Sequence, residues 1–208
     1  MTQPYVWAPV QPGQVADDGA INALGAAVTS HDTSIIALQA NGMAYRASST
    51  LATSAAVVTF TGIPTTLRRI QVFWRVRSDQ VAQFDVLHML INNDTAAHYN
   101  YEFTQGNGAG APLSAAGTGT TFGRIGYYVC NSATVGVFGT GVVWINGWNS
   151  PGAGFSLGWT YTAQAQTSSQ LNDVGGGNYN QAGPYTRLDF APSAGLFLAG
   201  TDFQIEGW

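Results

Sequence analysis

The chain has no lysine and little charge of either sign. Of its 208 residues, 9% are charged, and all seven basic residues are arginine. A typical soluble protein has about 25% charged residues. With a net charge of −4 and no arginine stripe that could track a phosphate backbone, the sequence argues against nucleic-acid binding. The basic cluster Arg68-Arg69 and Arg75 to Arg77 is interpreted as strand-face arginines paired with nearby carboxylates.

Cysteine and long apolar runs are scarce as well. Cys130 is the single cysteine, so no intrachain disulfide can form, and its apolar surroundings predict a small buried side chain. The first residues have no basic stretch followed by an apolar core, so no signal peptide is expected. No uninterrupted apolar run approaches about 18 residues, so no membrane span is expected.

So few charges mean that Ser, Thr, Asn, Gln and Gly must supply the polar surface. Two interpretations fit such a surface. One is that neighbouring subunits cover much of it, which is the commoner case, and the other is that it binds sugars or other neutral ligands.

Near the N-terminus, six positions, five of them apolar, keep an unbroken spacing of three and then four. These positions are Ile21, Leu24, Val28, His31, Ile35 and Leu38. The spacing predicts a coiled-coil helix over residues 17–40, and because so short a helix is marginal alone, copies of itself must cover the stripe. The side chain of His31 could set the register, form a ring of imidazoles or be partly solvated.

The segment before this helix predicts an extended peptide over residues 1–16. Prolines forbid a helix there, and aromatic and branched side chains alternate with them. We expect the segment to dock on a partner through Pro4, Tyr5, Val6, Trp7, Pro9 and Val10.

From residue 44 onward the apolar period changes to two, which predicts strands. The expected strands cover residues 57–60, 70–77, 84–91, 98–103, 122–130, 134–145, 155–165, 184–190 and 203–208. The Gly-rich segments 106–121 and 172–181 are expected to be loops. The fold class predicted is mainly β: an antiparallel jelly-roll-like β-sandwich head over residues 44–208, preceded by the extended peptide and the short helix.

Five short motifs carry a family resemblance. They are Val58-Thr-Phe-Thr-Gly-Ile-Pro64, then Leu67-Arg-Arg-Ile-Gln-Val72, then Ile91-Asn-Asn-Asp-Thr-Ala-Ala-His-Tyr-Asn-Tyr101, then Thr186-Arg-Leu-Asp-Phe190, and finally Gly200-Thr-Asp-Phe-Gln-Ile-Glu-Gly-Trp208. In order and spacing they resemble a family of tailed-bacteriophage virion proteins, which includes minor tail, fibre and head-decoration proteins. The chain departs from that pattern in having Glu206 where the family tends to have an aromatic residue, and residues 104–183 match no pattern.

The resemblance implies a homotrimeric appendage anchored to the capsid or tail by its N-terminus and assembled in the bacterial host cytoplasm. Its partners would then be other copies of itself and a capsid or tail protein, with a host-surface glycan as a further partner.

Catalytic constellations are not expected from this sequence. Asp85 and His88 are three residues apart, so they lie on opposite faces of one strand, whereas a loop could bring Asp94 and His98 together. No Ser/His/Asp set, paired acids or Cys/His metal spacing emerges. The prediction is a non-enzymatic protein without catalytic residues, bound metal or cofactor.

Aromatic residues in the unmatched middle region are the remaining functional lead. Tyr127, Trp144, Trp148 and Trp159 could stack on sugar rings, although tryptophans in a sandwich more often pack in the core or between subunits. A carbohydrate-binding, lectin-like adhesin is therefore the alternative function, and a glycan-cleaving enzyme is the third.

Overall fold

The computed structural model describes residues 44–107, 110–150, 157–166 and 170–208. Within these ranges the protein is mainly β, with two antiparallel sheets and no helix, as the sequence predicts. No helix in these ranges is therefore long and apolar enough to cross a membrane. The predicted attachment peptide (1–16) and coiled-coil helix (17–40) lie outside the described residues and stay predictions.

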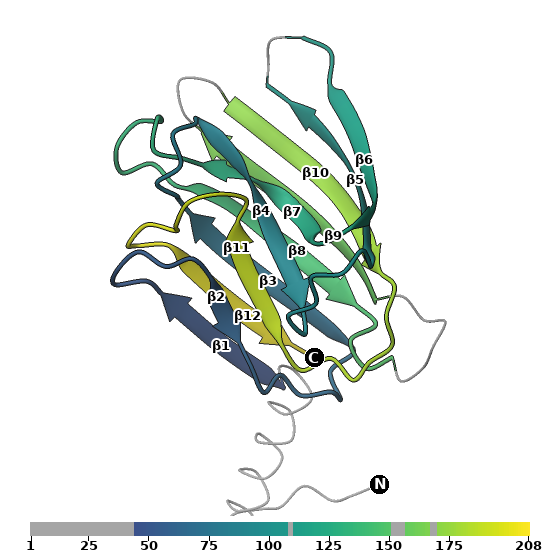
Figure 1. The fold of residues 1–208 in the computed structure, drawn as a ribbon. Helices are drawn as coiled ribbons and strands as arrows, with labels where there is room; N and C mark the ends of the chain where they lie inside the picture. Colours follow the sequence, from purple (N-terminus) through teal and green to yellow (C-terminus); the bar gives the residue numbers. More distant parts are fainter. Residues whose placement is uncertain (1–43, 108–109, 151–156, 167–169) are drawn as a thin grey trace, which may run out of the picture. The chain divides into compact units, whose positions relative to one another are not determined.

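Twelve strands occur in the described part of the chain (Figure 1). In chain order they are β1 (Tyr45–Thr50), β2 (Val58–Phe60), β3 (Arg69–Val76), β4 (Phe84–Ile91), β5 (Tyr99–Gly106), β6 (Leu113–Thr120), β7 (Gly123–Val129), β8 (Gly139–Asn146), β9 (Leu157–Gln166), β10 (Gln170–Tyr179), β11 (Leu188–Pro192) and β12 (Asp202–Gly207).

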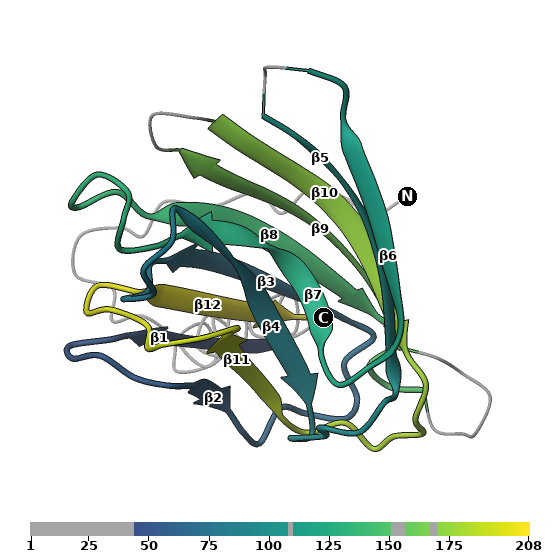
Figure 2. The ribbon, with the colours of Figure 1, turned by 45° about the horizontal axis from the view of Figure 1, so that its top comes forward.

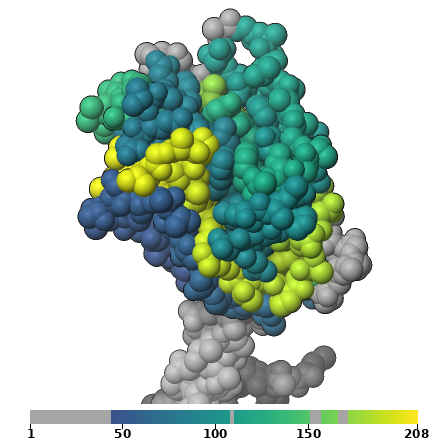
Figure 3. Space-filling model, viewed as in Figure 1, coloured from purple at the N-terminus to yellow at the C-terminus, as the bar shows by residue number. Residues whose placement is uncertain are grey.

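These strands form a larger and a smaller sheet. The eight-stranded sheet has the order β1-β12-β3-β8-β9-β10-β5-β6, and the four-stranded sheet has the order β2-β11-β4-β7. Figures 1 and 2 show the smaller sheet in front of the larger one. In Figure 3, seen from the same side as Figure 1, strand β10 is visible mostly along the margin, so one face of the larger sheet is covered.

The two sheets share one hydrophobic core. β3 illustrates the pattern, since Ile70, Val72, Trp74 and Val76 are buried between the sheets while Phe73 is exposed. Aromatic rings join the layers: those of Phe190 in β11 and Phe203 in β12 stack with centroids 4.6 Å apart. Burying these alternate side chains is the main favourable contribution to the stability of such a fold.

Two segments expected to be loops are strands instead. Residues 113–120 form β6, which pairs with β5, and residues 170–179 form β10, which pairs with both β9 and β5. Small residues are required in β10, because a Cβ on Gly177 would lie 2.2 Å from the carbonyl oxygen of Asn100 and 2.5 Å from the ring of Trp159.

Two expected strands begin four or more residues later than predicted, and the one expected over residues 184–190 starts at Leu188. The strand expected over residues 134–145 starts at Gly139, because the preceding carbonyls turn toward a buried arginine. The guanidinium of Arg77 donates hydrogen bonds to the carbonyl oxygens of Thr134 (2.7 Å), Val137 (2.8 Å) and Ala133 (3.1 Å).

The last strand, β12, is paired on both sides, with β1 and with β3. The backbone N–H groups of Arg68 and Trp208 donate to the carbonyl oxygens of Trp208 and Arg69, at 2.6 and 3.0 Å. At Gly207 a Cβ would lie 2.5 Å from Leu67 Cδ1, so the glycine makes room for that buried leucine.

Candidate ligand-binding site

The outer face of the larger sheet carries ordered rows of side chains, because antiparallel partners point to the same face. One row is Phe73, Val142, Thr162, Val174 and Thr104, contributed by β3, β8, β9, β10 and β5 in the order of the sheet. The next row along these strands is Arg75, Thr140, Gln164 and Asn172.

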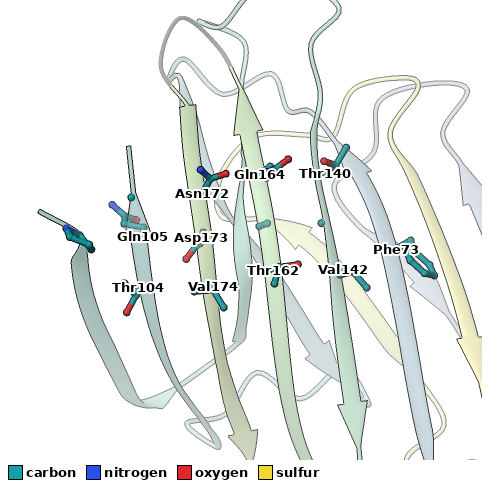
Figure 4. Close-up of a pocket in the computed structure, with 14 residues that line it drawn as sticks. Phe73, Thr104, Gln105, Thr140, Val142, Thr162, Gln164, Asn172, Asp173 and Val174 are labelled. Atoms are coloured by element: carbon teal, nitrogen blue, oxygen red, sulfur yellow. The ribbon is translucent and has the colours of Figure 1, made fainter. Parts of the chain in front are cut away.

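A hollow of about 640 Å³ lies over these two rows. Figure 4 shows its floor crossing β10, β9 and β8, with Phe73 at one end and Thr104 and Gln105 at the other. Its volume falls in the range of about 300–1,000 Å³ typical of small-molecule sites.

The surface of the hollow is mostly apolar, and uncharged polar side chains are set into it. Hydroxyl and amide side chains are contributed by Thr140, Thr162, Gln164 and Asn172, all exposed, and apolar surface comes mainly from Phe73, Val142 and Val174. None of these four polar side chains makes a hydrogen bond to another described residue. The floor therefore offers both donors and acceptors to a ligand.

Asp173 is the one ionisable residue among those lining the hollow, and its carboxylate points to the opposite face of the sheet. There it pairs with Arg124 of β7, with Nη2 to Oδ2 at 2.6 Å, and both side chains are buried. The hydroxyl of Tyr161 lies 3.3 Å from Asp173 Oδ1 and accepts from Arg124 Nε at 3.1 Å. The charge beneath the hollow is thus neutralised inside the protein.

Two aromatic rings enclose the guanidinium of Arg124, which lies 3.7 Å from the ring centroid of Phe103 and 4.2 Å from that of Tyr127. Burial raises the pKa of the Asp173 carboxyl, and the adjacent guanidinium opposes this shift. Burial also raises the pKa of Tyr161, so the hydroxyl keeps its proton. The cluster joins β7 to β10 and fixes the floor of the hollow from below.

The four aromatic residues suggested for glycan contact are not brought together. Trp144 is half-buried on the outer face, in the row Gln71, Trp144, Thr160, Gly176 and Glu102, beside the hollow but not lining it. Tyr127 is half-buried and stacks on Arg124.

Trp148 and Trp159 are core side chains, 1% and 2% exposed, so their rings cannot reach a ligand at the surface. Trp148 packs on Tyr185 with centroids 5.6 Å apart, and Trp159 Nε1 donates to the carbonyl oxygen of Arg124 at 3.0 Å. Core packing, the alternative considered from the sequence, is the role of both.

The arginine cluster also differs from expectation. Arg69 Nε donates to the amide oxygen of Asn146, Arg75 to the carbonyl oxygen of Gly200, and Arg77 to the loop carbonyls described above. These three arginines are held by uncharged oxygens rather than by the expected carboxylates.

A loop does bring Asp94 and His98 together. His98 Nδ1 lies 2.6 Å from Asp94 Oδ2, which also accepts a hydrogen bond from the Tyr179 hydroxyl at 2.7 Å. Burial acts to raise the pKa of Asp94, but hydrogen bonds from His98, the Ala96 N–H and Tyr179 outweigh it and leave the pKa below its ordinary value. Asp94, His98 and Tyr179 thus connect the β4–β5 turn to the end of β10 through hydrogen bonds.

Of the two other reactive side chains considered from the sequence, Cys130 is buried and His88 is half-buried. Cys130 is buried, as predicted, and burial raises the pKa of its thiol to about 11. His88 stacks on Phe122 with centroids 3.5 Å apart, and burial lowers its pKa to about 4. Asp85 is buried against Tyr128, on the other face of β4 from His88, as expected.

No group of three or more His, Cys, Asp or Glu side chains in the described ranges could hold a metal ion. Sequence reasoning missed the hydroxyl and amide residues of the hollow. Part of their signal was the alternation in Thr160-Tyr-Thr162-Ala-Gln164, in which Thr160, Thr162 and Gln164 are polar.

Comparison with known proteins gives no assignment: no protein-family model, curated protein or solved structure matches this chain.

Proposed function

We propose that the chain is a non-enzymatic structural protein of a tailed-phage virion. In this proposal it is a homotrimeric fibre or decoration appendage, residues 1–16 attach it to the capsid or tail, and residues 44–208 form an outward β head. It is assembled in the host bacterial cytoplasm and becomes part of the virion.

The observation that carries the proposal is that the resemblance motifs, far apart in sequence, pack as one unit. β2 belongs to the first motif and β4 overlaps the third at Ile91, and both strands pair with β11, which overlaps the fourth motif. The Ile63 N–H donates to the carbonyl oxygen of Thr186 at 3.0 Å. The side-chain oxygen of Asn92 accepts from the N–H groups of Thr186 and Arg187. Motif residues that support one another in this way favour a shared head fold over a chance likeness.

The strand order supports a jelly-roll head. Setting aside β1, β12 and the β9–β10 hairpin leaves the orders β2-β11-β4-β7 and β3-β8-β5-β6. Two interlocked Greek keys, the arrangement of a jelly roll, generate this alternation of early and late strands. The β9–β10 hairpin is then an insertion into one jelly-roll sheet, and it contributes much of the hollow.

Attachment is tested by deleting residues 1–15 and measuring how much of the chain co-purifies with phage particles. We expect incorporation to be lost while the head stays folded. Thr2→Ala with Gln3→Ala is the matched control inside the same segment and should incorporate normally. Normal incorporation of the deleted chain would contradict the proposed attachment.

A carbohydrate-binding adhesin or tail receptor-binding protein is the second candidate, favoured by the uncharged hollow with its free hydroxyl and amide groups. Binding without particle incorporation would support this candidate alone. Release of new reducing ends from a host polysaccharide would overturn the non-enzymatic assignment.

A further inference from the structure

We infer that the hollow on the outer face of the larger sheet binds a neutral oligosaccharide. Hydroxyl and amide side chains of β8, β9 and β10 hydrogen-bond the sugar, and the ring of Phe73 packs on it. The inference rests on the carbohydrate-binding candidate and does not depend on the virion role.

The polar groups of the hollow are matched to sugar hydroxyls. Each threonine hydroxyl can donate one hydrogen bond and accept others, and the amides of Gln164 and Asn172 each supply two donors and one acceptor. A sugar hydroxyl both donates and accepts, so a mixed set suits it better than a purely acidic or basic one. These side chains make no hydrogen bond to other described residues and are exposed, so a ligand need not displace an internal partner.

The dimensions of the hollow suit an oligosaccharide of several units rather than a single sugar ring. Its lining reaches from Phe73 on β3 to Thr104 on β5, which are four strand intervals apart in the sheet. Neighbouring strands lie about 4.8 Å apart, so this span is about 19 Å. Polar side chains recur from one strand to the next along it, which allows successive sugar units to be held in the same way.

Apolar surface lies beside the polar groups. Phe73 is 41% exposed and Val174 is 53% exposed, although both are hydrophobic and project from the middle of a sheet. Val142 lies between Phe73 and Thr162 in the same row. The C–H faces of pyranose rings cover such surface and remove it from water, while the ring hydroxyls stay at the edges.

The absence of charge in the lining sets the ligand class. The carboxylate of Asp173 is paired with Arg124 on the other face of the sheet. Arg75, next to Thr140 in its row, donates to the carbonyl oxygen of Gly200, and its guanidinium lies 4.7 Å from the ring centroid of Phe138. The hollow therefore has no cation to pair with an acidic sugar. A neutral sugar needs no such partner, so the uncharged lining favours a neutral ligand.

The test is a glycan array of neutral hexose and N-acetylhexosamine oligosaccharides, with sialylated glycans for comparison, probed with the full chain. The strongest neutral hit is then titrated by calorimetry against three variants. Thr162→Trp fills the hollow, Gln164→Ala with Asn172→Ala removes the amides, and Gln83→Ala is an exposed control away from the hollow. We expect binding to be lost in the first, about tenfold weaker in the second and unchanged in the third.

Two kinds of result would overturn the inference, one in the binding measurement and one in the sedimenting mass. One is no neutral oligosaccharide bound by the folded chain, or one bound equally well by Thr162→Trp. The other is a fall in sedimenting mass on Thr162→Trp, which would make this face a contact between copies of the chain. Particle incorporation, measured separately, tests the virion role, so failure of one proposal is distinguishable from failure of the other.

Discussion

Two of the seven arginines are buried, and each is stabilised in a different way. Arg124 has a carboxylate partner and two aromatic rings, whereas the guanidinium of Arg77 donates to the oxygens of peptide carbonyls. A planar fork of donors can reach several carbonyls at once, which a single ammonium group cannot. Arg77 thus shapes the loop after β7 through geometry as well as charge.

Arg77→Lys should therefore destabilise the protein although it keeps the charge. We expect a loss of about 2–3 kcal/mol, because two or more hydrogen bonds to Thr134, Val137 and Ala133 are lost inside the protein. Urea unfolding measures this, with exposed Arg68→Lys as the control that should change stability by less than about 0.5 kcal/mol. Equal losses of stability in the two variants would contradict a specific role for the Arg77 guanidinium.

His88 should make stability depend on pH. Burial lowers its pKa to about 4, with Asp85 acting to raise it and Arg124 to lower it further, whereas the unfolded imidazole has a pKa of about 6.5. Between these values the unfolded chain binds the proton and the folded chain does not, so stability falls as pH falls through this window. The slope contributed is at most about 1.4 kcal/mol per pH unit.

His88→Gln is the variant that isolates this contribution, because carboxylates titrate in the same way in both proteins. Urea unfolding at pH 7.5, 6.5, 5.5 and 4.5 should show the wild type losing stability faster than the variant below pH 6.5. Parallel curves would mean that His88 is protonated as readily in the folded as in the unfolded protein.

At the scale of elements, β10 depends on its small residues. Gly177→Ala should cost about 2–3 kcal/mol, because the new methyl group overlaps the carbonyl oxygen of Asn100 and the ring of Trp159, and the ladder between β5 and β10 prevents the strands from separating. Gly106→Ala, at a strand position with nothing within 4 Å of the added Cβ, is the matched control. Thermal unfolding of both variants checks the difference, and an unaffected Gly177→Ala protein would refute the close approach.

These elements also explain what the sequence could and could not predict. Strands with apolar alternation, such as β3, were predicted because one face is buried and the other is not. β6 was missed because it is exposed over most of its length and so has no apolar face, and β10 because Trp159 and Tyr161 occupy the space that its own side chains would fill.

The candidate site was only partly predictable for the same reason. Trp144 and Trp159 lie on adjacent strands, and their types alone do not tell which ring faces the core. The hollow depends on the registers of five strands, and no short stretch of sequence encodes those registers. Polar alternation was visible in the sequence, but the row it belongs to arises only when the sheet is assembled.

At the scale of the whole molecule, self-association and folding of the head should be separable. The predicted seam lies at residues 21–38, outside the described residues, while the described residues of 44–208 share a hydrophobic core between their own strands. Leu24→Asp with Ile35→Asp puts charges into the seam, and charges at such positions oppose helix association. Asn22→Asp with Thr33→Asp, outside the seam positions, adds the same charge and is the matched control.

We expect the wild type and the control to sediment at three times 21.9 kDa and the seam variant at one third of that mass. Cys130 reports on the head in the same samples, since its buried thiol, with a pKa raised to about 11, should react with a thiol reagent at pH 8 only after unfolding. Slow labelling of a dissociated seam variant would mean that the head folds without association. Rapid labelling would make association part of head stability, and a wild type that sediments as a monomer would remove the basis for a trimeric appendage.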